Sequence, residues 1–346
     1  MIKSPLRYPG GKSKAIKKLS EFTDIAFKEY REPFVGGGSL FIYLKQCFPD
    51  RQFWINDLNT DVYSFWKAAQ ENLAEMLKLI KKFKKEKDGK ALYRKLLEMN
   101  LDKLSLTERG ARFFVLNRIT FSGTTESGGY SERAFQGRFT DSSIDRVAAL
   151  SEILDENVKI TNLDYSELLQ VNEDDEAGEN AEIEVPKKHG TVAERTSSRL
   201  RRTNDRSGRV ISSDAEHARQ VSYASKRKYK LDLSSLHEDH EDNENAEIEV
   251  QPQCQILIYL DPPYYSATHS RLYGKKGNLH SGFDHQRFSE EIKACNMNWF
   301  ISYDNSKFVR ELFSFAKQHA WQLQYGMNNP NKDSCLMGEE LIVSGF

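Results

Sequence analysis

Residues 256–265 read ILIYLDPPYY, an apolar run that ends in an acid, two prolines and two tyrosines. Its first five residues are apolar or aromatic, which is typical of a strand buried on both faces of a parallel sheet. Because proline fixes φ and has no N–H, the carbonyls around Pro262 and Pro263 become acceptors in set directions. Asp261 and the carbonyl of Pro262 can thus bind the two N–H groups of an exocyclic amine, while Tyr264 stacks on the ring that carries it. The alternative is a strand that simply ends in a proline turn.

Two further glycine-rich motifs lie toward the N-terminus. EPFVGGGSLF (32–41) predicts a strand, a turn and a helix from Ser39, whose free N–H groups and positive dipole suit a nucleotide or a carboxylate. The spacing is neither that of a dinucleotide fingerprint nor that of a Walker loop, so a dehydrogenase or an NTPase is disfavoured. LRYPGGK (6–12) predicts a loop over an anion or an aromatic ligand. A plain structural turn is the alternative for each motif.

Acids follow several predicted strands. FWIND (53–57) ends at Asp57, 21 residues after Gly36, which is where an acid binds a ribose diol in nucleotide folds. Helix capping is the alternative for Asp57. Three later strands also end in acids, at Asp164, Asp261 and Asp304. Strands alternate with helical patterns, including one amphipathic helix over 61–83, which predicts an α/β fold whose strand ends share one ligand-binding edge.

Charge is distributed unevenly along the chain of 346 residues, whose net charge is −1. The segment 172–250 has 13 basic and 19 acidic residues, and the sequence ENAEIEV occurs in it twice. Its low apolar content predicts a charged, disordered insertion. Without its net charge of −6, the rest of the chain carries +5, which permits a polyanionic partner. The cysteines have no metal-ligand spacing, and no membrane segment or signal core is evident, so we expect a cytoplasmic protein without metal.

Together the motifs resemble the Dam-like, class-alpha DNA adenine-N6 methyltransferases. EPFVGGGSLF and DPPYY carry most of the resemblance; LRYPGGK is similar to the N-terminal cofactor motif, and NLDYSEL, FISYDN and EELIVSGF follow in the family's order. The likeness covers nearly the whole chain outside 172–250, although Tyr8 stands where many members have Trp. It implies a Rossmann-like sheet with an antiparallel C-terminal hairpin, S-adenosylmethionine as methyl donor, and a flipped-out adenine of double-stranded DNA as acceptor.

The resemblance also assigns residues and regions. Residues 1–60 would begin the catalytic domain, 61–140 would form a small helical target-recognition region, and 141–171 with 251–346 would complete the catalytic domain. The implied catalytic residues are Asp261, Pro262, Pro263 and Tyr264. The implied cofactor-binding residues are Tyr8, Lys12, Phe34, Gly36, Gly38, Asp57, Asp164 and Asp261.

FFVLNRITFSGTTESGGYS (113–131) is similar to the family's target-recognition helix and loop. The candidate DNA-binding residues are Arg118, Phe121, Ser122, Arg133 and Arg138. The arginines suit phosphates or guanines, and Phe121 is a candidate wedge into the base stack. We expect a monomer acting on DNA, and we expect the ring of Tyr264 to matter more than its hydroxyl.

Two alternatives to an active DNA methyltransferase remain open from the sequence. The chain is either an active enzyme or a non-catalytic DNA-binding relic whose site the insertion has spoiled; the complete motifs favour the enzyme. An amino group on RNA or protein is a third target, although Asp261 favours adenine over a protein glutamine, for which related enzymes carry Asn. A role in restriction-modification and a role outside it are both compatible with the sequence.

Overall fold

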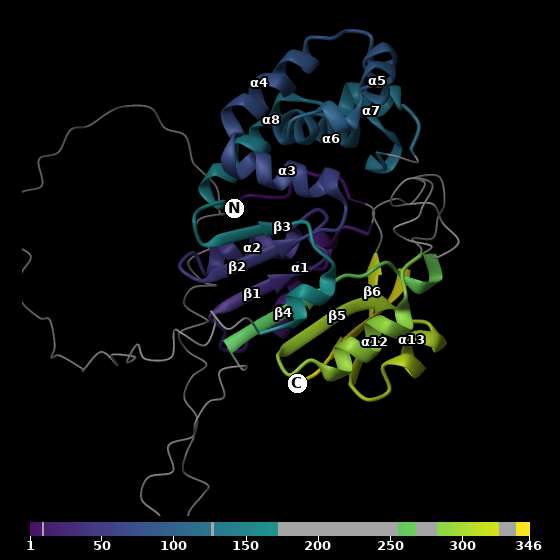
Figure 1. The fold of residues 1–346 in the computed structure, drawn as a ribbon. Coiled ribbons are helices and arrows are strands. Elements are labelled where there is room, and N and C mark those ends of the chain that lie inside the picture. Colours follow the sequence, from purple (N-terminus) through teal and green to yellow (C-terminus); the bar gives the residue numbers. More distant parts are fainter. Residues whose placement is uncertain (9, 126–127, 172–254, 268–281, 325–336) are drawn as a thin grey trace, which may run out of the picture. The chain divides into compact units, whose positions relative to one another are not determined.

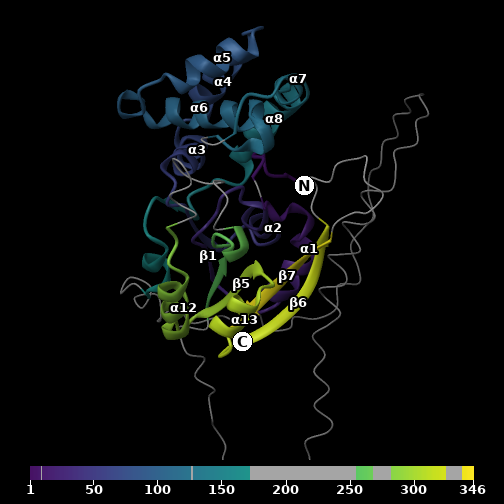
Figure 2. The ribbon, with the colours of Figure 1, turned by 90° about the vertical axis from the view of Figure 1, so that its right-hand side faces the viewer.

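A computed structural model describes residues 1–8, 10–125, 128–171, 255–267, 282–324 and 337–346. The predicted insertion, 172–250, lies outside these residues. The described chain forms a seven-stranded sheet in the order β3-β2-β1-β4-β5-β7-β6 (Figures 1 and 2). The strands are β1 (Glu29–Glu32), β2 (Gln52–Asn56), β3 (Val158–Thr161), β4 (Ile256–Leu260), β5 (Asn298–Asp304), β6 (Lys317–Gln324) and β7 (Met337–Ser344).

Strands β1 to β5 are parallel, and β7 pairs antiparallel with both β5 and β6. The Rossmann-like sheet and its antiparallel C-terminal hairpin are therefore confirmed. Strand order runs outward in both directions from the central pair β1 and β4, where Tyr30 lies beside Leu257. Open α/β sheets bind ligands at such a switch point, outside the carboxyl ends of the strands. The glycine turn follows β1 and the Asp-Pro-Pro-Tyr sequence follows β4, so both lie at that point.

The alternation of side chains along the strands builds a core on each face of the sheet. Leu257 and Tyr259 pack into one core, together with side chains of α2 (Ser39–Cys47). The other core takes Ile256, Ile258 and Leu260, and α12 (His285–Ala294) and α13 (Lys307–Leu312) cover it. Strand β4 is thus buried on both sides, as its unbroken apolar run predicts.

A group of helices follows β2, and the first of them lies nearest the sheet (Figure 1). These helices are α3 (Thr60–Glu71), α4 (Leu73–Lys84), α5 (Gly89–Leu97), α6 (Leu106–Ile119), α7 (Glu132–Arg138) and α8 (Asp141–Ala148). The long α6 is buried from Gly110 to Ile119 and contacts α3, α4, α5 and α7. In the chain apart from its undescribed stretches, no helix is both long and apolar enough to cross a bilayer.

Short helical turns complete the chain. They are α1 (Ile16–Leu19) and the 3-10 turns η1 (Lys12–Lys14), η2 (Ser20–Thr23), η3 (Leu101–Lys103), η4 (Phe121–Gly123), η5 (Ala149–Glu152), η6 (Tyr165–Leu169) and η9 (Tyr265–Ala267). Two of them matter for the site because η1 begins at Lys12 and η9 directly follows Tyr264.

The prediction of a single helix over 61–83 is wrong. Asn72 has φ −138° and ψ 40°, outside the helical region. Its N–H donates the last hydrogen bond of α3, to the carbonyl of Ala68, and α4 starts at the next residue. Asparagine competes with helical hydrogen bonding and favours such ends. The predicted stripe is still buried, with Phe65 in α3 and Ile80 in α4, because both helices pack on α6. The first strand also ends earlier than EPFV suggests, at Glu32, since Pro33 has no N–H for the ladder.

Candidate functional site

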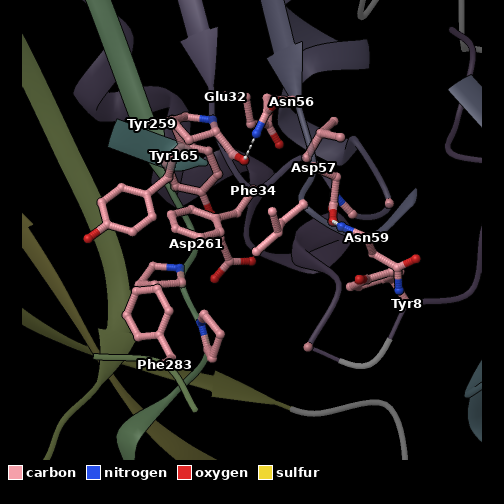
Figure 3. Close-up of a pocket in the computed structure, with 18 of the residues that line it drawn as sticks. Tyr8, Glu32, Phe34, Asn56, Asp57, Asn59, Tyr165, Tyr259, Asp261 and Phe283 are labelled. Carbon is pink, nitrogen blue, oxygen red and sulfur yellow. Dashed lines mark hydrogen bonds between the residues drawn. The ribbon is translucent and has the colours of Figure 1, made fainter. Parts of the chain in front are cut away.

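A cavity of about 520 Å³ opens at the carboxyl ends of β1, β2 and β4 (Figure 3). It brings together every residue predicted from the sequence to bind cofactor or to act in catalysis. Ser122, from the predicted DNA-binding set, also lines it. Figure 3 shows the carboxylate of Asp261 on one side of this space, with Asp57 and Tyr8 on the other.

Asp261 is held by two polar side chains. Lys12 Nζ lies 2.7 Å from its Oδ1 and 2.9 Å from its Oδ2, and Lys12 is only 5% exposed. Ser302 Oγ, on β5, donates to Oδ1 at 2.8 Å and is itself 2.9 Å from the Tyr259 hydroxyl. A carboxylate has about four acceptor sites, and these contacts use three of them. The carboxylate is therefore fixed in direction and still has capacity for one more donor.

Tyr264 lies beside this carboxylate and is anchored at its far end. Its hydroxyl donates to Glu340 Oε2, on β7, at 2.5 Å. Lys12 Nζ lies 4.8 Å from the centre of its ring, and the ring of Tyr303 is 5.9 Å away. Burial, followed by the charges of Asp261 and Glu340, raises the pKa of Tyr264 well above its usual value, so the phenol keeps its proton.

The glycine turn after β1 depends on two backbone conformations that side chains rarely adopt. Gly36 has φ +43° and Gly38 has φ +60°. A Cβ atom on Gly36 would lie 2.8 Å from the ring of Tyr8, and one on Gly38 would lie 2.7 Å from the ring of Trp66. Trp66 also donates its ring N–H to the carbonyl of Gly36 at 3.0 Å. The turn is thus closely packed below and leaves its backbone facing the cavity.

Asp57 supports this turn from β2. It accepts hydrogen bonds from the backbone N–H groups of Gly36 and Asn59, each at 2.9 Å. Burial raises its pKa to about 6, although these two hydrogen bonds act in the opposite direction. Helix capping, the alternative for Asp57, falls instead to Asn59, which is the N-cap of α3 and accepts from the N–H of Asp61. Two acceptor sites remain on the Asp57 carboxylate for a ligand.

Asp164 closes the side of the cavity near an aromatic cluster. It accepts hydrogen bonds from Ser166 and lies 3.0 Å from Arg287 Nη2. Its partial burial opposes ionisation, but these contacts outweigh burial and hold its pKa below the usual value. Close by, the rings of Phe34 and Tyr165 stack with centres 5.5 Å apart, and Phe283 lies within 5.9 Å of both. The wall is apolar, with a charged group at its edge.

The other predicted DNA-binding residues lie outside the cavity lining. Phe121 is 70% exposed, and Arg133 and Arg138 are exposed on α7. Arg118 is buried, and its Nε donates to the carbonyl of Arg138 at 3.1 Å. In this position its guanidinium supports α7 rather than facing solvent, so the structure gives no direct route from Arg118 to a phosphate.

Arginines nevertheless gather around Arg118. Burial and the charges of Arg7, Arg146 and Arg138 lower its pKa to about 10, and the pKa of Arg7 is lowered by burial and by Arg138. Asn117 fixes the backbone of Arg7 by accepting from its N–H at 2.8 Å and donating to its carbonyl at 2.7 Å. In the described residues none of these four arginines forms an ion pair with an acid. The cluster is next to the cavity along the chain, because Tyr8 directly follows Arg7, Ser122 comes four residues after Arg118, and both Tyr8 and Ser122 line the cavity.

Three site residues were not identified from the sequence. Glu32 is buried, accepts from the Tyr30 hydroxyl at 2.7 Å and from the N–H of Phe41 at 3.1 Å, and has its pKa raised to about 8 by burial. Its position at a strand end was a usable signal. Ser302 and Glu340 carry no such signal, because each looks like an ordinary polar residue within a strand. Where the chain is described, no group of His, Cys, Asp or Glu side chains is arranged to hold a metal ion.

Comparison with known proteins shows which family this chain belongs to. The chain is 26% identical over 179 residues to the Type II methyltransferase M1.LlaDCHI of Lactococcus lactis subsp. cremoris, which covers 49% of this chain and 61% of that protein. It is 26% identical over 136 residues to the Type II methyltransferase M.MjaIII of Methanocaldococcus jannaschii, covering 35% of this chain and 47% of that protein. The chain thus matches about half the length of these relatives. The family model for D12 class N6 adenine-specific DNA methyltransferases matches residues 8–177 and 197–327, and the chain belongs to that family.

Proposed function

We propose that this protein is a site-specific DNA methyltransferase that moves the methyl group of S-adenosylmethionine to N6 of a flipped-out adenine. The observation that carries the proposal is the state of Asp261. Its carboxylate is oriented by Lys12 and Ser302, keeps one acceptor site, and lines the same cavity as Tyr264 and the glycine turn. Both relatives are named as Type II methyltransferases, which favours DNA modification as the activity.

The residues that line the cavity suit the groups of the proposed cofactor. Gly36, Gly37 and Gly38 line the cavity and carry no side chains, so a ligand can approach their backbone and the N-terminus of α2. Asp57 retains acceptor capacity for a ribose, and the cluster of Phe34, Tyr165 and Phe283 offers an apolar wall for a purine. When bound, S-adenosylmethionine supplies an electrophilic methyl group on a sulfonium.

Within this frame the protein groups act by orientation. Asp261 accepts one N–H of the target amine, and the carbonyl of Pro262, fixed by the two prolines, accepts the other. The nitrogen lone pair is then directed out of the plane of the base. As N6 becomes positive, the nearby carboxylate stabilises that charge until one N6 proton passes to solvent water. No covalent bond between enzyme and base is needed, and positioning supplies much of the acceleration.

Adenine N6 is paired and stacked in duplex DNA, so the base must leave the helix to reach Asp261. Phe121, exposed at the end of α6, is suited to fill the space left in the stack. Arg138, exposed beside buried Arg118, is suited to a phosphate next to the cavity. We therefore keep Phe121, Ser122, Arg133 and Arg138 in the proposed DNA surface and assign Arg118 a supporting role.

Charge distribution points to a second region of DNA contact. Residues 78–95, from the end of α4 through α5, contain nine basic and two acidic residues, a net charge of +7. Outside 172–250 the whole chain carries only +5, so all other residues together contribute −2. Most of these lysines are exposed, and in the described residues only Lys78 and Lys95 of this stretch pair with acids. A surface of this kind suits the phosphate backbone.

Transfer of a labelled methyl group from S-adenosylmethionine to duplex DNA tests the proposal. Wild-type protein should yield N6-methyladenine in the digested DNA, and Asp261→Ala should lower the rate at least about 10²-fold while the protein stays folded. Asp145→Ala, which removes an exposed carboxylate on α8, is the matched control. DNA binding without transfer by wild type would instead support the relic, and transfer only to RNA or protein would identify another acceptor. Mapping modified adenines in a methylation-free host would then give the recognition site.

A further inference from the structure

Glu340 occupies a position where an acid is costly. It lies within β7, opposite Asp304 of β5, and its side chain has no exposed surface. Burial raises its pKa to about 7; Lys12 and the hydrogen bond from Tyr264 lower it, and Asp261 and Asp304 raise it. A buried carboxyl group is tolerated when it makes good hydrogen bonds. The one hydrogen bond found for its side chain within the described residues comes from Tyr264.

That hydrogen bond joins β7 to the aromatic residue of the Asp-Pro-Pro-Tyr sequence. Tyr264 follows two prolines in a segment without strand pairing, whereas Glu340 is fixed in a strand bonded on both sides. Contact at the hydroxyl, the point of the ring farthest from the backbone, limits rotation of the side chain about its own bonds. Glu340 therefore fixes the direction in which the long axis of the Tyr264 ring points, and so the place that the ring occupies in the cavity.

We infer that Glu340 is a positioning residue for methyl transfer, which fixes the ring of Tyr264 against the target base by accepting the hydrogen bond of its hydroxyl. This inference rests on the proposed function, in which Tyr264 stacks on adenine. It differs from the expectation drawn from the sequence, in which the ring of Tyr264 matters more than its hydroxyl. Phenylalanine at 264 would keep the ring but lose the anchor, and would leave the Glu340 carboxyl buried without its donor.

A double-mutant cycle on residues 264 and 340 tests the inference. The variants are Tyr264→Phe, Glu340→Ala, their combination, and Glu340→Gln, which keeps an acceptor oxygen in a side chain of the same size. Glu339→Ala is the matched control, because Glu339 is the exposed neighbour of Glu340 on the same strand. The measurements are the single-turnover rate of methyl transfer to DNA, the dissociation constants for S-adenosylmethionine and for DNA, and a melting curve for each variant.

We expect Tyr264→Phe and Glu340→Ala each to slow transfer between about 10- and 100-fold, since small displacements of reacting groups have effects of this size. The double variant should be no slower than the slower single variant, because the two residues act through one hydrogen bond. Glu340→Gln should recover most of the rate, and the cofactor dissociation constant should stay within about twofold of wild type throughout. A purely structural role for Glu340 would lower the melting temperature without this pattern in the rates.

The inference is overturned if folded Tyr264→Phe transfers methyl within about twofold of wild type, or if the losses in the two single variants multiply in the double variant. The first result decides the matter even if Glu340→Ala does not fold. Failure of the proposed function gives a different outcome, because wild-type protein itself would then transfer no methyl group to DNA. In an active wild type, unchanged rates in the variants would remove only the role of Glu340.

Discussion

Lys12 and Asp261 are 249 residues apart in the chain, and their side chains form a partly buried ion pair with Nζ 2.7 Å from Oδ1. The pair joins the N-terminal loop to the carboxyl end of β4, across the point where strand order reverses. Lys12 also donates to the carbonyl of Gly10 at 2.9 Å, so the loop is folded around its own lysine. The loop and the proposed catalytic carboxylate therefore position one another.

Removing this charge should affect both stability and transfer. Lys12→Met keeps an unbranched side chain but leaves Asp261 without its cation. We expect unfolding free energy to fall by about 1–3 kcal/mol, less than the roughly 3–5 kcal/mol typical of a fully buried pair, because the Asp261 side chain is 23% exposed. Methyl transfer should slow at least about tenfold because the carboxylate is no longer fixed. Lys17→Met, on an exposed lysine nearby, should change neither the unfolding free energy nor the rate of methyl transfer. Urea titration measures the first, and single-turnover kinetics measure the second.

The glycine turn gives a second prediction. Gly36→Ala combines a positive φ with a Cβ atom 2.8 Å from Tyr8, so it should displace that ring and weaken binding of S-adenosylmethionine about tenfold or more. Gly137→Ala, in α7, meets nothing within 4 Å and should leave binding unchanged while stability stays equal or rises by up to about 1 kcal/mol. Calorimetric titration compares the two. Equal cofactor affinity in both variants would contradict the assignment of the turn.

Glu32 predicts a specific dependence of stability on pH. Its pKa is raised from 4.5 to about 8 in the folded protein, so between these values the native state holds a proton that the unfolded state releases. Stability should therefore fall as pH rises across this window, by up to about 1.4 kcal/mol per pH unit from this group. The glutamine in Glu32→Gln does not titrate, so the unfolding free energy of this variant should fall less steeply with pH. Unfolding free energies from about pH 5 to about pH 8.5 test this, with exposed Glu98→Gln as control; superimposable profiles for wild type and Glu32→Gln would refute it.

The basic stretch over α4 and α5 should govern how salt affects DNA binding. Changing exposed Lys81, Lys82 and Lys85 to glutamate should weaken binding at low salt and flatten the plot of log affinity against log salt. The slope should change by about one unit for each phosphate that the variant no longer neutralises. Affinity for S-adenosylmethionine should not change.

The matched control makes the same charge change elsewhere on the surface. Lys293, Lys307 and Lys317 are exposed, and changing them to glutamate alters net charge equally. Fluorescence anisotropy with a labelled duplex at several salt concentrations compares the two triple variants. If both flatten the slope equally, overall charge and not the α4–α5 stretch is responsible.

Much of the fold was predictable because it depends on local patterns. The apolar run before Asp261 predicts a central strand, and β4 is buried along its whole length. Acids after strands predict convergence at one edge, and Asp57, Asp164 and Asp261 line one cavity. The break at Asn72 was missed because the apolar spacing continues across it, and only the packing of two helices on α6 shows why the interruption is tolerated.

The partners of the site residues were not predictable in the same way. Tyr264 and Glu340 are 76 residues apart and meet only because β7 returns antiparallel beside β5. Arg118 likewise looks like an exposed DNA contact in sequence, although helix packing buries it against the carbonyl end of α7. The position of a strand can be predicted from its apolar residues. These contacts depend instead on how the strands pair and how the helices pack, which no single motif specifies.

The seam between β1 and β4 divides the protein into two lengths of polypeptide, residues 1–171 and 255–346, that meet at the centre of the sheet. Lys12 and the glycine turn belong to the first length; Asp261, Tyr264 and Glu340 belong to the second. Neither length contains a whole site. A chain cut once within 172–254 would hold the complete site only while its two pieces remain paired along that seam, which makes this protein a natural candidate for assembly from separately expressed halves.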